Sequence, residues 1–225
     1  MSLLGTAVLA IWNDVAPGGD AEFDHWHTNE HVPERVGVPG FLRGRRYLAV
    51  SGSHRYFTLY ETESLDTLAR GPYIERLDNP TAWSRRALPL FRNNNRSACR
   101  VVLSLGQGVG GSLAAVRLGP REGREADLRS WLVDKALPAL AGHPCVVGVH
   151  FCEADESATR VPTQERRLRP QEDEVARWIV LAEAGGTQPA DVAVREFLGP
   201  DELARQGAGP DAVFGLYRLL YCLSK

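Results

Sequence analysis

The feature that most constrains the fold of this chain is an internal repeat at an offset of 105 residues. When residues 5–46 are aligned without gaps with residues 110–151, eight positions are identical, whereas composition alone would give about three. Half of these identities follow the same order and spacing in both halves: Trp26, Pro33, Gly37 and Pro39 match Trp131, Pro138, Gly142 and Pro144. The chain is therefore predicted to contain one fold twice.

The repeat resumes further along at an offset of 122 residues. There Arg55, Leu59 and Glu61 match Arg177, Leu181 and Glu183. The difference of 17 residues between the two offsets indicates an insertion in the second half, at about 156–172. That stretch is charged and has no apolar period, so we expect a surface loop. We place one unit at 1–106 and the other at 107–225.

Each half has the same predicted order of elements. In the first half, apolar runs and turn residues predict strands at 6–12, 41–50, 55–63 and 99–105 and helices at 21–36 and 65–70, with Asp20 as N-cap and residues 71–96 as an excursion. In the second half, the equivalent segments are 112–118, 124–141, 145–153, 175–184, 189–197 and 212–222. This βαββαβ order is the ferredoxin-like unit.

Strands such as 101–103 and 178–181 are apolar on both faces, so both faces of each sheet need cover. Helices can cover one face, and the other sheet is the simplest cover for the second face. We therefore expect an α+β fold in which two antiparallel sheets pack face to face as an intramolecular barrel.

Composition excludes several classes of protein. The net charge is −2 with no isolated basic run, which argues against a nucleic-acid partner. No apolar stretch is long enough to cross a membrane or resembles a signal peptide, so we expect a cytoplasmic protein. The cysteines are far apart and are expected to be reduced and buried: Cys99, Cys145, Cys152 and Cys222.

The long helix of each half provides an internal control for locating a site. In the second half an apolar stripe includes Leu132 and Ala136 at helical spacing, and the equivalent residues of the first half are His27 and His31. Two inward histidines in place of aliphatic residues predict a polar pocket in the first half alone. Trp26 has a counterpart in Trp131, which favours a core role over a role in the site.

Two further patterns leave alternatives open. The string HTNEH, residues 27–31, also fits the inverted zinc-peptidase pattern, with Glu30 as base. It lacks an evident third ligand, although Glu61 or Glu75 could be proposed, and we expect no metal. The basic cluster of Arg43, Arg45 and Arg46 is either a solvated strand face or the source of one anion partner for the pocket.

The string Trp26-x4-His31-x-Pro33, followed by Pro39-Gly40-Phe41 and Arg46-Tyr47, resembles the signature of EthD-like proteins in the dimeric α/β-barrel superfamily. The resemblance covers mainly residues 6–63. It implies a tandem fusion of two units that are usually homodimeric, with the family's helix histidine at His31. Members include cofactor-free monooxygenases, isomerases, dehydratases and cyclases of aromatic or polyketide substrates.

We therefore expect a small cofactor-independent enzyme that moves a proton on an aromatic, polyketide-like or lactone substrate. His31 would be the acid and base and His27 would orient it, while the candidate ligand contacts are Trp26, Asn29, Arg46, Tyr47 and Tyr60. A non-catalytic small-molecule-binding or stress-response module and a metal hydrolase are the alternatives. Whether the tandem chain forms a homodimer stays open.

Overall fold

The strands of this protein close into a single barrel. In the computed structural model, which describes residues 3–225, eight antiparallel strands pair in the order β1-β3-β2-β8-β5-β7-β6-β4. Their bounds are β1 Ala7–Val15, β2 Phe41–Ser51, β3 Tyr56–Thr62, β4 Phe91–Gly106, β5 Ser112–Leu118, β6 Val146–Ala154, β7 Trp178–Ala184 and β8 Val213–Ser224. The predicted α+β class is therefore correct.

The two halves of the chain contribute four neighbouring strands each. The order is β4-β1-β3-β2 in the first half and β8-β5-β7-β6 in the second, so strands that are equivalent in the repeat take equivalent places. Pairing of β2 with β8 and of β4 with β6 joins the halves. The two four-stranded sheets are thus continuous at both edges, and the expected barrel is closed. The division at residue 106 stays a prediction.

One pair of matched glycines has the same task in both halves. A Cβ atom at Gly5 would lie 1.9 Å from the carbonyl oxygen of Thr62, and one at Gly110 would lie 2.4 Å from that of Ala184. Only glycine tolerates such a close approach of two backbones. The identity of these residues at the offset of 105 therefore has a steric cause.

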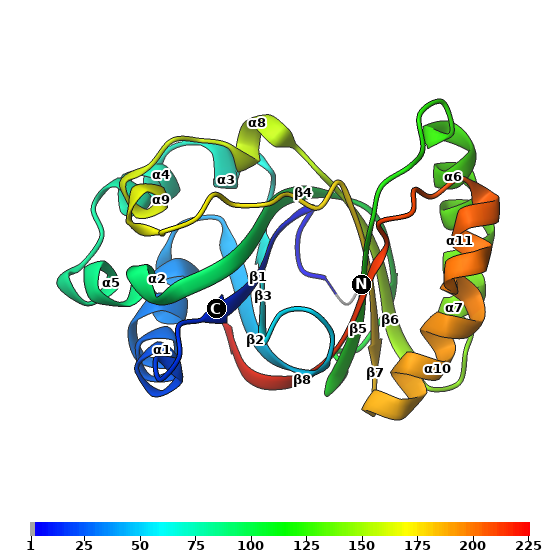
Figure 1. Cartoon of the computed structure of the whole chain (residues 1–225), viewed down its shortest axis with the longest axis horizontal. Helices are drawn as coiled ribbons and strands as arrows, with labels where there is room; N and C mark the ends of the chain where they lie inside the picture. The colour runs from blue at the N-terminus through cyan, green and yellow to red at the C-terminus, as the bar shows by residue number, and fades with distance from the viewer. Residues whose placement is uncertain (1–2) are drawn as a thin grey trace.

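Helices cover the barrel on two opposite sides (Figure 1). Those of the first half are α1 Asp20–Trp26, α2 Val32–Gly37, α3 Asp66–Ala69, α4 Pro72–Asp78 and α5 Ala82–Ala87, with a 3-10 turn η2 Leu88–Leu90. Those of the second half are α6 Glu125–Trp131, α7 Leu137–Ala141, α8 Glu156–Thr159, α9 Gln164–Leu168, α10 Thr187–Leu198 and α11 Pro200–Gln206. Within residues 3–225, no helix has the length and apolar character needed to cross a bilayer.

Both long helices contain a π turn at equivalent positions. The turns are η1 His27–His31 and η3 Leu132–Ala136, exactly one repeat offset apart, and each is followed after one residue by a proline. Proline has no N–H group and cannot donate the next i→i−4 bond, which favours a wider turn before it. The turn is therefore a property of the fold, and the histidines replace aliphatic residues within it.

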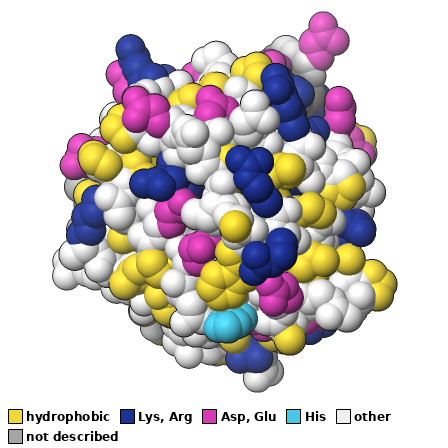
Figure 2. Space-filling model, turned by 90° about the vertical axis from the view of Figure 1, so that its left-hand side faces the viewer, with side chains coloured by type: hydrophobic (Ala, Val, Ile, Leu, Met, Phe, Trp, Pro, Cys, Tyr) yellow, Lys and Arg dark blue, Asp and Glu magenta, His cyan; other side chains and the backbone are white. Residues whose placement is uncertain are grey.

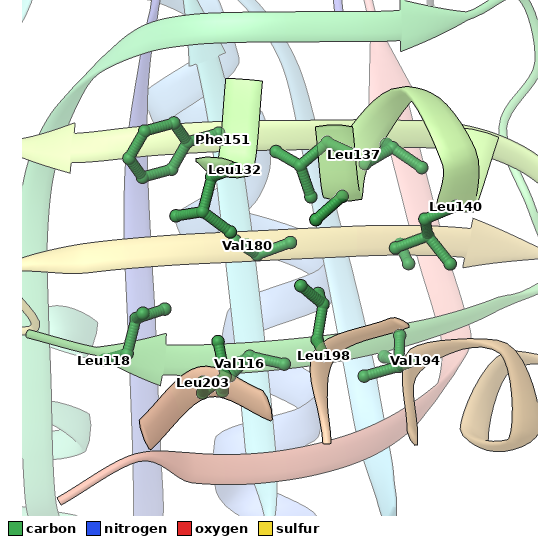
Figure 3. Packing of buried hydrophobic residues seen from close by; sticks show 14 of the residues in the cluster. Val116, Leu118, Leu132, Leu137, Leu140, Phe151, Val180, Val194, Leu198 and Leu203 are labelled. Atoms are coloured by element: carbon green, nitrogen blue, oxygen red, sulfur yellow. The ribbon is translucent and has the colours of Figure 1, made fainter. Parts of the chain in front are cut away.

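In the second half this helix packs as a conventional core. Leu132 and Leu137 lie over Val180 and Phe151 of the barrel, as Figure 3 shows. Burial of each such side chain contributes roughly 1.5–3 kcal/mol.

The barrel interior contains buried charges as well as apolar side chains. Arg45 lies between Glu61 and Glu183, with nitrogen–oxygen distances of 3.0 and 2.8 Å, and all three side chains are fully buried. Arg43 pairs with Glu61 at 2.8 Å, and His150 lies 3.2 Å from Glu183. Although burial opposes ionisation, the hydrogen bond with His150 and the charge of Arg45 lower the pKa of Glu183 to about 2.

For Arg43 and Arg45, this network excludes the first of the two alternatives, a solvated strand face. It also explains why glutamates recur at the offset of 122, because Glu61 and Glu183 approach the same guanidinium from the two halves.

The inserted segment 156–172 is not a loop. It contains α8 and α9, crosses from the second half over the top of the barrel, and lies against α3 and α4 of the first half (Figure 1). Its residue Glu165 is buried. The insertion therefore covers helices that belong to the other half.

Two local predictions are wrong. Asp20 is the first residue of α1 rather than its cap, and its carboxylate accepts a hydrogen bond from the Tyr56 hydroxyl at 3.0 Å. Of the four cysteines, Cys145 and Cys222 are exposed, and only the other two lie in the barrel interior.

Candidate functional site

The two histidines of η1 point into the protein. His27 and His31 are 3% and 7% exposed, and their ring centroids are 5.3 Å apart. The His31 ring also packs against Trp26, at 4.2 Å between centroids. The helix face that is apolar in the second half is thus buried in the first half too, but with imidazoles.

The surroundings keep both imidazoles neutral. Burial, followed by the charges of Arg46 and Arg35, lowers the pKa of His27 well below its ordinary value of 6.5. Burial and the charge of Arg35 do the same for His31. The Nδ1 atoms of both rings are buried without a hydrogen-bond partner among the described residues. Such groups are uncommon in folded proteins and point to a missing partner.

The buried histidines predict a stability that falls with acid. Because their pKa values are lower in the folded than in the unfolded state, their full contribution is present above pH 6.5 and is lost as the pH falls below it. Each histidine contributes a loss on the order of 1 kcal/mol per pH unit while its unfolded form takes up a proton and its folded form does not.

Urea unfolding at about pH 7 and about pH 5.5 checks this. We expect wild type to lose more stability than the double variant His27→Gln, His31→Gln over that interval, by on the order of 2 kcal/mol. Equal losses in the two proteins would show that these rings titrate normally.

A small cavity adjoins His31. Its volume is about 30 Å³, room for on the order of two water molecules. The polar wall includes Tyr60 and Asn94, and the Tyr60 hydroxyl and Asn94 Oδ1 are also buried without a hydrogen-bond partner in the described part of the chain. The apolar wall consists of Leu9, Ile11, Leu77, Leu88 and Phe91. Burial raises the pKa of the Tyr60 phenol above its usual range, so this group is a hydrogen-bond donor at neutral pH.

The inserted segment contributes to the wall of this cavity. Glu165 of α9 forms a buried ion pair with Arg35 of α2, and Arg35 also binds Glu34 at 2.9 Å. Arg169, directly after α9, lines the cavity and pairs with Asp173 at 3.1 Å. The wall of a chamber in the first half is thus completed by residues of the second.

Sequence reasoning did not assign Arg35, Glu165, Arg169 or Asn94 to the site. For Arg35 a signal existed, because its counterpart is the fully buried Leu140. Like the two histidines, Arg35 therefore stands at a position that is apolar in the second half.

The other candidate residues lie at different places. Tyr60 lines the cavity, whereas Trp26 packs in the neighbouring core and donates to Ser84 at 3.2 Å. Arg46 binds Thr28 at 2.9 Å and the Asp24 carbonyl at 3.2 Å, on the helix side of the barrel near His27.

Two candidates are not brought to the cavity. Tyr47 points into the barrel interior, where it stacks on Phe57. Asn29 is exposed and its amide donates to the His25 carbonyl at 2.8 Å. Their proposed contacts with a ligand do not follow from these positions.

The zinc-peptidase arrangement requires Glu30 beside the two histidines. Its carboxylate instead accepts hydrogen bonds from Thr81 at 2.6 Å and Ser84 at 3.3 Å, and so ties the helix to α5. This glutamate serves the packing of α1 and η1 against α5.

Comparisons with known proteins were made at the levels of sequence and structure. No family model matches this sequence, and no curated protein matches it. An anthrone oxidase-like protein has a similar structure, with a TM-score of 0.65 at 13% identity over 97% of this chain and 92% of that one. The chain has the same fold as this protein.

Two other solved structures give the same result at lower similarity. A heme-binding protein from Thermus thermophilus has a TM-score of 0.54 at 16% identity, over 96% of this chain and 92% of that chain. A monooxygenase-like protein from Listeria innocua has a TM-score of 0.50 at 8% identity, over 97% and 96%. At these identities the likeness shows the fold alone.

Proposed function

We propose that this protein is an EthD-like tandem barrel enzyme that transfers a proton on an aromatic, polyketide-like or lactone molecule without a cofactor. The observation that carries the proposal is a buried, neutral histidine, His31, beside a cavity whose other polar groups also lack partners. Structural likeness to an anthrone oxidase-like protein supports the class of substrate.

The chemistry follows from the protonation states. A neutral imidazole has a lone pair that can accept a proton from a carbon or phenol next to a carbonyl. The developing negative charge would fall on an enolate or phenolate oxygen, to which the Tyr60 hydroxyl can donate a hydrogen bond. Arg35 and Arg169 line the same wall, where each is paired with a carboxylate, Glu165 and Asp173 respectively. His31 then returns the proton to a different atom, so that the reaction is balanced within the substrate.

His27 is proposed as a positioning residue. Its ring packs next to that of His31 and lies 3.5 Å from Thr58 Oγ1, at the limit of a hydrogen bond. It does not line the cavity. If it became protonated, its charge would disfavour protonation of His31, so proton uptake by His31 requires a neutral His27.

Deuterium incorporation tests the proposal directly. The protein is incubated in D₂O with phenols, hydroxyketones and lactones that have an acidic C–H bond, and loss of the proton signal is followed by NMR. We expect at least one compound to exchange faster with wild type than with His31→Gln. If none of the compounds exchanges faster with wild type than with His31→Gln, the proposal is wrong.

The alternative, a binding module without chemistry, gives a different result in the same samples. Ligands would then change the intrinsic tryptophan fluorescence, because Trp26 contacts His31, but none would exchange.

A further inference from the structure

A larger groove lies on the outside of the segment that contributes to the wall of the cavity. It is bounded by α3 and α4 on one side and by residues 159–175 on the other, and its volume is about 380 Å³. That is the range of small-molecule sites. Leu68, Ile74, Val161 and Pro162 give it an apolar lining.

The groove has an excess of positive charge. Five arginines and two acidic residues line it: Arg96, Arg160, Arg166, Arg167, Arg169, Glu172 and Asp173. This excess contrasts with the net charge of −2 of the whole chain. The face formed by the first-half helices shows basic, acidic and apolar side chains next to one another (Figure 2).

Three of these arginines already have partners. Arg166 and Arg169 pair with Asp173, and Arg96 donates to the Tyr73 hydroxyl and to the Thr159 carbonyl. Arg160 and Arg167 are exposed, and neither has an acidic partner among residues 3–225. Two cations at the edge of an apolar groove match the charge of an amphipathic anion.

The groove and the cavity share part of their lining. Leu77, Arg96 and Arg169 line both spaces. A connection between them requires a change of rotamer at Arg169, which is paired with Asp173, or at Leu77. Such a change is required before a molecule in the groove can reach His31.

We propose that this groove binds a molecule with an apolar ring system and a carboxylate, and that Arg160 and Arg167 hold the carboxylate while the ring faces His31. The inference rests on the proposed function for the role of His31, and it adds that the substrate is an anion. It also gives the insertion at 156–172 a task, since that segment provides both arginines.

Binding of two matched probes tests the groove. The probes are 2-naphthoate and the uncharged 2-naphthalenemethanol, and calorimetry gives their dissociation constants. We expect wild type to bind the carboxylate roughly tenfold more tightly, as two partly exposed ion pairs allow. The double variant Arg160→Gln, Arg167→Gln should bind the two probes equally. The control Arg85→Gln, Arg86→Gln removes the same charge from exposed positions on α5 and should keep the preference.

The outcomes separate this proposal from the proposed function. The groove proposal is wrong if wild type binds both probes equally, or if the variant with Arg160 and Arg167 replaced still prefers the carboxylate. His31→Gln should keep the preference, because the groove arginines are intact. A retained preference together with no proton exchange in any compound supports the groove and refutes the enzyme.

Discussion

Replacement of Arg45 by methionine is expected to lower the free energy of unfolding by about 3–5 kcal/mol, because it leaves two carboxylates buried without their shared cation. Arg45 is fully buried and contacts Glu61 and Glu183 from the two halves of the chain. Its loss therefore acts at the centre of the barrel. Urea unfolding at neutral pH, with a linear extrapolation to water, measures the effect.

A matched control is available on the same barrel. Arg100 of β4 is exposed, and Arg100→Met should change the free energy of unfolding by no more than about 0.5 kcal/mol. Arg45→Lys keeps the charge but loses the fork of donors, and should lie between wild type and the methionine variant. A loss below about 1 kcal/mol for Arg45→Met would mean that the carboxylates accept protons or water at little cost.

Replacement of His31 by glutamine is expected to reduce the rate of proton exchange by roughly 100- to 10,000-fold, the usual contribution of a general base. Glutamine keeps the polarity but cannot accept a proton in this pH range. Because the pKa of His31 lies well below 6.5, the wild-type rate should be independent of pH between about 6.5 and 8 and should fall only in acid. Initial exchange rates measured by NMR across this range give both results.

His25→Gln serves as the control for this variant. His25 lies six residues earlier on the exposed side of the same helix, against Trp83. Its replacement should leave the exchange rate unchanged within a factor of about two. A His31→Gln protein that is folded by circular dichroism and as fast as wild type would contradict the assigned role, and so would an equal loss in His25→Gln.

The part of the site that the sequence predicts is the part in which the two halves differ. His27 and His31 stand where Leu132 and Ala136 fill the core, and the structure buries all four side chains. The comparison works because equivalent helices, including their π turns, occupy equivalent places on the barrel. The second half thus shows which face of the helix points inward.

The rest of the site depends on contacts between residues far apart in the sequence, which local sequence patterns do not predict. Glu165 meets Arg35 across 130 positions of sequence, and it does so only because the insertion crosses to the other half. Its segment has a charged composition, which is typical of a solvated loop. The burial of Arg43 and Arg45 could not be predicted from the strand alone either. Their face of the strand becomes an interior face only when the barrel closes.

Because the barrel closes within one chain, its closure does not depend on protein concentration, as it would if two separate chains formed it. The seams β2–β8 and β4–β6 are made without a second molecule, so their formation is a unimolecular event whose equilibrium does not shift with concentration. A substitution in one half also has no automatic copy in the opposite half. Histidines can therefore replace apolar residues on the buried helix face of one half while the other half keeps its leucines. The loss of apolar packing then occurs once per barrel rather than twice.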